Sequence, residues 1–256
     1  CRGSAFAKAL GEPQQCSAVG NPIHSSTGNK YQRETDYGGA GGQLVFERHY
    51  NSITYPAYAW DQFTAIGKLW RHTYDRWITE SVTTSLTTAN VYREDGKVFA
   101  FNLYNGGYYG DRDVQSKLSR LYDNGTPVGW KYVDQADDSE ETYNNEGRLT
   151  SIKSRSGITL TLTYDAGRLT TIVDSFGREI ALSYDSAGQV ASITDPAGGQ
   201  YLYEYATNGN LVRVTYPDGH DREYVYDISG QPHALSGIID ENESRYATYG
   251  YTSGGR

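Results

Sequence analysis

The sequence predicts an all-β protein built from antiparallel β-hairpin repeats that form a twisted sheet. Three observations predict this fold. A unit containing a tyrosine and a glycine recurs about every 21 residues in the second half of the chain, and a fixed period is the signature of a repeat architecture. The runs between these units alternate apolar and polar residues, as strands with one buried face do. No long segment carries a helical apolar period with capping residues.

The composition agrees with many short, half-buried strands. The 256 residues include 24 Tyr, 6 Phe, 4 Trp and 29 Gly. Tyrosine suits such strands, because its ring packs while its hydroxyl reaches water or a partner. Glycine suits the tight turns between them. The net charge of −8 argues against nucleic acid as a partner, and no apolar stretch is long enough to form a transmembrane segment.

Each repeat is expected to contain two strands and two glycine turns. In the second copy, Tyr-Asp-Ala-Gly-Arg at 164–168 is followed by a Leu-x-x-Ile step, a turn at 174–177 and a strictly alternating return strand. Such chained hairpins coil rather than lie flat, and tyrosines at one repeat position should be cross-strand aromatic neighbours. The repeat tyrosines and turn glycines are Tyr143 and Gly147, Tyr164 and Gly167, Tyr184 and Gly188, Tyr205 and Gly209, Tyr226 and Gly230, and Tyr251 and Gly255.

The rest of the chain is less regular. We expect a leader or linker at 1–20, an N-terminal β domain at 21–140 and the repeats at 141–256. Strand-like runs occur at 44–50, 70–77 and 98–103, and Asn-Gly pairs at 105–106 and 124–125 predict hairpin turns.

The two cysteines, Cys1 and Cys16, both lie in the first 20 residues. A disulfide between them would close a loop of roughly 15 residues, contribute about 3 kcal/mol and imply an oxidising compartment. Two other interpretations stay open: Cys1 as the lipidated first residue of a lipoprotein, or two unpaired thiols. The chain contains no methionine, so its natural start is expected upstream of Cys1.

The repeats resemble the YD repeats of the bacterial Rhs proteins, which also occur in the C component of insecticidal Tc toxin complexes and in animal teneurins. The pattern of that repeat is Tyr-Asp-x-x-Gly-Arg-Leu-x-x-Ile, and at least five successive copies here are variants of it. Residues 233–249 are similar to another Rhs segment. The segments at 20–37, 46–52 and 70–76 resemble the domain that precedes such repeats.

This resemblance implies a spiralling sheet that is part of a YD-repeat shell. It also implies a non-catalytic role: the shell encloses or displays a C-terminal domain, such as a toxin, of a secreted or exported bacterial protein. The expected partners are the remainder of the shell, its C-terminal cargo domain and a secretion-apparatus or cell-surface partner, and the expected location is secreted or at the cell surface. Five to six repeats are too few to close a shell, so we expect the chain to be the N-terminal part of a larger one.

No motif predicts catalysis, a cofactor or a metal. Nucleophile elbows, phosphate loops and zinc helices are absent, and the five histidines lack metal-ligand spacing. The acidic run at 134–141 is interpreted as a solvated linker rather than a pair of glycosidase carboxylates. The acidic segment 240–243 could bind calcium weakly, but a turn explains it. The Asp of Tyr-Asp is replaced by Asn144, Ala206 and Thr252, which favours a turn-fixing role.

Two alternative functions come from other classes of protein. Tyr and Trp on strands could stack on sugar rings, which suggests a carbohydrate-binding or adhesive cell-surface module. A hydrolase would centre on His72, between Trp70 and Tyr74. We also expect an open ribbon of repeats to be stable only if it closes on itself, oligomerises or pairs with more of the shell.

Overall fold

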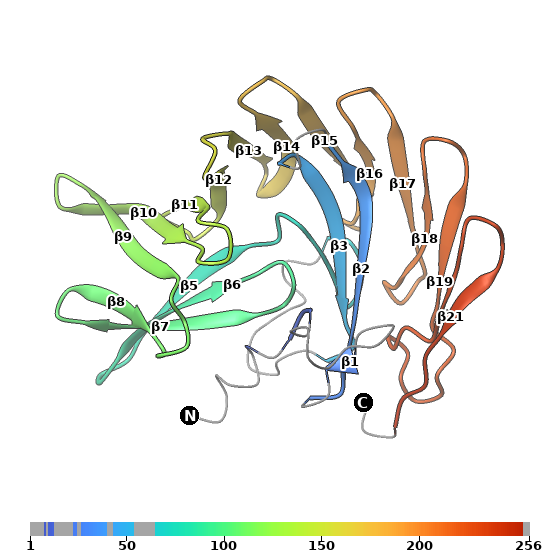
Figure 1. Ribbon diagram of the computed structural model, residues 1–256, viewed down its shortest axis with the longest axis horizontal. Helices are drawn as coiled ribbons and strands as arrows, with labels where there is room; N and C mark the ends of the chain where they lie inside the picture. Colours follow the sequence, from blue (N-terminus) through green and yellow to red (C-terminus); the bar gives the residue numbers. More distant parts are fainter. Residues whose placement is uncertain are drawn as a thin grey trace.

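A computed structural model describes residues 8, 10–12, 23–24, 27–39, 43–53 and 65–252 (Figure 1). Every regular element in these residues is a β-strand, and every strand pair is antiparallel, which confirms the predicted fold class. The described part of the chain therefore holds no helix of the length and apolarity needed to cross a membrane. Cys1, Cys16 and Gly255 lie outside the described residues.

The larger sheet, which we call the outer sheet, contains seventeen strands in chain order from β5 to β21. Its strands are β5 (Trp77–Val82), β6 (Thr87–Tyr92), β7 (Val98–Tyr104), β8 (Gly107–Gly110), β9 (Lys117–Asp123), β10 (Thr126–Val133), β11 (Glu140–Asn144), β12 (Leu149–Lys153), β13 (Thr159–Asp165), β14 (Arg168–Asp174), β15 (Glu179–Tyr184), β16 (Val190–Thr194), β17 (Gln200–Tyr205), β18 (Leu211–Thr215), β19 (Asp221–Val225), β20 (Gly237–Ile239) and β21 (Arg245–Thr248).

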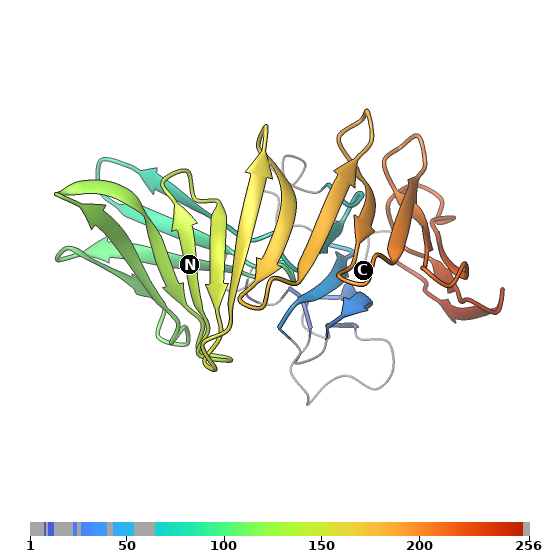
Figure 2. The same cartoon turned by 90° about the horizontal axis from the view of Figure 1, so that it is seen from above.

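The outer sheet closes on itself near its first strand. Trp77 of β5 forms a bridge with Arg148, and the Ile78 N–H donates to Gly147 O at 2.9 Å, so β5 meets the turn between β11 and β12. From β13 onward the hairpins continue as an arc that ends at β21, far from β5 in both views (Figures 1 and 2).

Local turn chemistry explains the hairpins of the outer sheet. In the turn between β14 and β15, the Asp174 carboxylate accepts the backbone N–H groups of Phe176 and Arg178 at 2.8 and 3.0 Å. Gly177 then takes a φ of 78°, which glycine adopts without steric cost. The two Asn-Gly pairs form the tips of the β7–β8 and β9–β10 hairpins with positive φ at both residues, as the sequence predicts.

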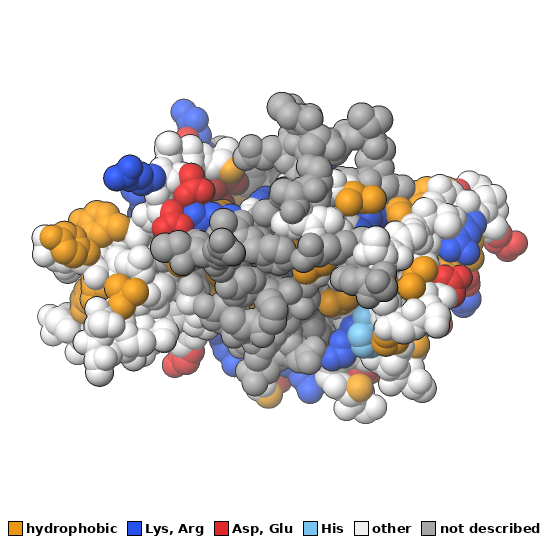
Figure 3. Space-filling model, turned by 90° about the horizontal axis from the view of Figure 1, so that it is seen from below, with side chains coloured by type: hydrophobic (Ala, Val, Ile, Leu, Met, Phe, Trp, Pro, Cys, Tyr) orange, Lys and Arg blue, Asp and Glu red, His pale blue; other side chains and the backbone are white. Residues whose placement is uncertain are grey.

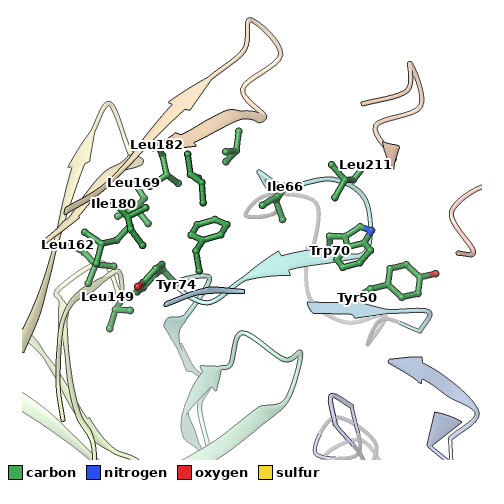
Figure 4. Packing of buried hydrophobic residues seen from close by; sticks show 14 of the residues in the cluster. Tyr50, Ile66, Trp70, Tyr74, Leu149, Leu162, Leu169, Ile180, Leu182 and Leu211 are labelled. Carbon is green, nitrogen blue, oxygen red and sulfur yellow. The ribbon is translucent and has the colours of Figure 1, made fainter. Parts of the chain in front are cut away.

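A smaller sheet, which we call the inner sheet, lies within the curve of the outer sheet (Figures 1 and 2). Its strands are β1 (Ile23–His24), β2 (Asn29–Gly38), β3 (Val45–Asn51) and β4 (Trp70–His72), in that order. The core lies between the two sheets: Ile66, Trp70 and Tyr74 point at leucine and isoleucine side chains of the outer sheet (Figure 4). Period-2 alternation buries Ile180 and Leu182 of β15 on this side.

One strand predicted in the first half is wrong. The run 70–77 is not one strand, because the chain turns after His72 and passes from the inner sheet to the outer sheet at Trp77. Strands β5 to β10 belong to the same sheet as the repeats, and the boundary expected at 140 falls at the first residue of β11. Within the expected leader, Leu10 is fully buried and the Gly11 N–H donates to Asn51.

Candidate functional site between the inner and outer sheets

A buried ion pair joins the inner sheet to the repeats. Arg48 of β3 donates through Nε and Nη2 to the two carboxylate oxygens of Asp36 in β2, at 2.7 and 2.8 Å, and both side chains are fully buried. The Tyr203 hydroxyl donates to Asp36 at 2.7 Å, and the Tyr224 hydroxyl accepts from Arg48 at 2.8 Å. Burial opposes the charge of Arg48, but Asp36 raises the pKa of the guanidinium above its ordinary value. The charged pair is therefore an interior link between β2–β3 and β17–β19.

Further polar bonds cross the same contact. Trp70 Nε1 donates to the Tyr226 hydroxyl at 2.9 Å. The Tyr50 hydroxyl donates to His233 O at 3.0 Å and accepts the Leu235 N–H at 2.9 Å. Aromatic side chains of the inner sheet thus satisfy polar groups of the fifth repeat, in which residues such as Pro232 and His233 are inserted.

The repeat tyrosines form a hydrogen-bond ladder. The hydroxyls of Tyr164, Tyr184 and Tyr205 donate at 2.7–2.8 Å to the backbone carbonyl fifteen residues earlier in the chain. Tyr251 makes the corresponding bond to Leu235 O at 2.8 Å. Burial raises the pKa of Tyr164 and Tyr184 above the ordinary value, so these hydroxyls stay protonated donors.

This ladder corrects the expected stacking of successive repeat tyrosines. Among the described residues, no ring pair joins two consecutive repeat tyrosines. Repeats advance by two strands, and strands lie about 4.8 Å apart, so the two rings are separated by an intervening strand. Instead, Arg148 and Arg168 lie over the rings of Tyr164 and Tyr184, at 5.9 and 5.4 Å from the ring centres.

In two repeats the residue after the tyrosine is an Asn or Asp that precedes a three-residue turn, and its side chain stabilises that turn. The Asn144 side chain accepts the Arg148 N–H, and the Asp185 carboxylate accepts the Gln189 N–H, each at 2.8 Å. These bonds hold the first turn of the repeat closed.

The acidic run before the first repeat is not wholly the solvated linker that the sequence predicts. Asp137 and Asp138 are exposed, but Glu141 is fully buried between Arg76 and Arg93, and Tyr143 donates to it at 2.5 Å. Although burial raises it, the pKa of Glu141 falls to about 2 because of the two arginines. The charge of this residue is paired in the interior, which sequence position alone could not show.

His72 lies beside a cavity of about 580 Å³ between the inner sheet and the repeat turns, lined partly by Lys68, Arg148 and Arg168. Its Nε2 is 3.1 Å from Asp75 Oδ1, and its Nδ1 accepts the Tyr74 N–H. Both ring nitrogens therefore have partners within the fold, and burial lowers the pKa of the imidazole. The structure brings no other histidine to this cavity among its described lining residues.

The candidate metal segment is a turn. The Asp240 carboxylate accepts the N–H groups of Asn242 and Ser244, each at 3.0 Å. The described residues contain no group of three or more His, Cys, Asp or Glu side chains arranged to hold a metal ion. Asp36, Arg48 and Arg93, which no sequence motif indicates, make buried ion pairs in the structure.

The fold and these contacts define a curved wall of chained hairpins whose polar side chains hold the wall together. The chain belongs to the teneurin YD-shell family, whose model matches residues 70–256. A second family model, described as a domain of unknown function, matches residues 20–101. The chain has a structural role, as a segment of a shell.

Comparison with individual proteins gives more distant matches. No curated protein matches the chain. Among solved structures, TcdB2–TccC3 without its hypervariable C-terminal region is 16% identical with a TM-score of 0.37, over 72% of this chain. The Photorhabdus luminescens Tc holotoxin pore with a mutated TccC3 is 17% identical with a TM-score of 0.32, over 88% of this chain. The chain spans 12% and 11% of the lengths of these two solved chains.

Proposed function

We propose that this chain is a wall segment of a YD shell that encloses or displays a C-terminal cargo domain, such as a toxin, of a secreted or exported bacterial protein. The remainder of the shell and the cargo domain are its partners in this proposal. A secretion-apparatus or cell-surface partner then receives the assembled shell.

One observation carries the proposal: the polar groups that recur in the repeats are used in bonds that hold the wall. The tyrosine hydroxyls reach backbone carbonyls of the neighbouring strand, and the Asp or Asn side chains close turns. A repeated binding or catalytic site would leave such groups directed at a ligand. Membership of the YD-shell family supports the same conclusion.

Protease protection of the cargo tests this proposal in the natural full-length polypeptide. We expect its C-terminal domain to resist trypsin at concentrations that degrade the same domain expressed alone. Gly147→Ala should abolish that protection, because a β-carbon there would lie 1.9 Å from Ile78 O and open the closure at β5. Gly219→Ala is the matched control, since nothing lies within 4 Å of its β-carbon position. Equal cleavage of free and shell-linked domains would refute enclosure.

Exposed aromatic rings favour a second candidate function, adhesion through the wall's outer surface. Tyr104 and Tyr109 are 68% and 59% exposed, and the β7–β8 register places both on one face of that hairpin. Hydrophobic side chains gather at this end of the molecule (Figure 3). Exposed tyrosine rings of this kind can stack on sugars.

A glycan array distinguishes this second candidate. Saturable binding by the wild-type protein that is lost in Tyr104→Ala and Tyr109→Ala, but kept in Tyr246→Ala, would establish it. Tyr246 is a suitable control because it is 46% exposed on a different strand, β21. No binding to any glycan would exclude carbohydrate as the ligand and leave the shell proposal untouched.

A further inference from the structure

The turn glycines of the repeats share one feature that their positive φ does not explain. Each of the first four is covered by a group from elsewhere in the chain. Over Gly167 lies Arg148, whose Nη1 donates to Gly167 O. Over Gly188 lies Arg168, whose Nη2 would be 2.8 Å from a β-carbon at that glycine. In both cases the covering residue directly follows the turn glycine of the preceding repeat.

At Gly209 a different group covers the turn glycine, because the sequence of the preceding repeat differs. The third repeat has Gln189 in place of arginine after Gly188, so no arginine is available to cover Gly209. There the segment 65–69, which leads into β4, takes the position. The Lys68 N–H donates to Gly209 O at 2.9 Å, and Lys68 Cγ lies 3.5 Å from the β-carbon position of that glycine. A backbone N–H and a lysine side chain thus replace the guanidinium.

A second backbone hydrogen bond aligns segment 65–69 with the repeats at this contact. The Val190 N–H donates to Ala65 O at 2.7 Å, immediately after Gln189 in the chain. In the first repeat a backbone segment also covers the turn glycine, because no preceding repeat supplies an arginine. Its Gly147 O instead accepts the backbone N–H of Ile78 at 2.9 Å.

We propose that the row of turn glycines is a docking surface for the backbone of β5 and of segment 65–69, and that the residue after each glycine determines whether an arginine or such a backbone segment covers the next turn. An arginine at that position covers the turn glycine of the next repeat. Glutamine at that position leaves the next turn glycine uncovered by the repeats. Gln189 therefore allows segment 65–69 to pack on Gly209, and this contact determines the position of the inner sheet. This inference concerns the fold of the chain and does not depend on enclosure of a cargo.

The Gln189→Arg variant tests the proposal. Its guanidinium should reach Gly209 as Arg168 reaches Gly188, and displace Lys68. We expect the amide protons of Lys68 and Val190 to exchange at least about tenfold faster than in the wild type, corresponding to about 1.4 kcal/mol of lost local protection. Hydrogen exchange resolved to these amides, with Tm and far-UV circular dichroism to verify folding, provides the measurement.

Two variants make the result specific. Gln231→Arg is the same substitution at the equivalent position of the fifth repeat, where segment 65–69 makes none of the contacts above, and it should leave both amides protected. Gln189→Met removes the amide without adding a guanidinium and should also behave as the wild type. Unchanged exchange in a folded Gln189→Arg protein would overturn the proposal, as would equal acceleration in Gln189→Met.

Discussion

Substituting Asp36 by asparagine gives the sharpest test of how the two sheets are held together. The Asp36 carboxylate accepts two hydrogen bonds from Arg48 and one from Tyr203, all between 2.7 and 2.8 Å and all fully buried. Asparagine keeps the shape but leaves the Arg48 charge without its counter-ion in the interior. Removing one partner of a buried ion pair typically costs about 3–5 kcal/mol.

We therefore expect Asp36→Asn to lower the free energy of unfolding by about 4 kcal/mol and Tm by roughly 10 °C, given the size of the domain. Urea denaturation followed by tryptophan fluorescence suits this measurement, because Trp70 lies over Arg48, with the guanidinium carbon 5.2 Å from the ring centre. The added change Arg48→Met should restore part of the loss, since no unpaired charge then remains.

A surface pair provides the control for this experiment. Arg155 and Asp138 lie 3.2 Å apart with side chains that are 80% and 60% exposed. Arg155→Gln should leave Tm unchanged within error, because water screens such pairs. The reasoning is wrong if Asp36→Asn costs less than about 1 kcal/mol, or if the double variant is less stable than the single one.

Three further predictions follow from the same contacts. Arg93 and Arg76 overcome the effect of burial and lower the pKa of Glu141 to about 2, from an ordinary value of 4.5. Stability should therefore be full above pH 4.5 and fall as the pH drops towards 2, by about 3 kcal/mol, and urea midpoints of Glu141→Gln should vary less over that range than those of the wild type. Tyr184→Phe should cost about 1 kcal/mol in urea denaturation by removing one ladder bond, and a neutral result would deny the ladder a role in stability. Gly147→Ala should cost more than Gly219→Ala, for which a positive φ alone costs about 1–2 kcal/mol in the same assay; equal costs would show that the β5 closure is not held at Gly147.

The hairpins were predictable because their determinants are local. A glycine at positive φ, an Asp or Asn that accepts the N–H two and four residues later, and alternating side chains all act within about ten residues. The strands at 45–51 and 98–104 and both Asn-Gly turns could be predicted for the same reason. The run 70–77 was not, because its aromatic residues serve two different sheets.

The contacts between sheets could not be predicted from the sequence. Asp36 and Tyr203 are 167 residues apart in the chain, and no local pattern indicates that they meet. Glu141 belongs to a run of acids that is indistinguishable from a solvated linker until Arg76 and Arg93 are placed beside it. The sequence period predicts the positions of the repeat tyrosines, but their hydroxyl partners depend on the strand that separates successive repeats.

The sequence by itself determined the all-β class, the repeat of two strands and two turns, and the family resemblance, because each rests on short-range spacing along the chain. Only the tertiary structure decided that the sheet closes at β5, that an inner sheet fills its curve, and that Arg48, Glu141 and Lys68 make its interior contacts. These depend on groups that are distant in the chain, such as Glu141 and Arg93 at 48 residues and Arg48 and Tyr224 at 176, and that packing brings together. Burial gives such charges their energetic weight only once the two sheets have met.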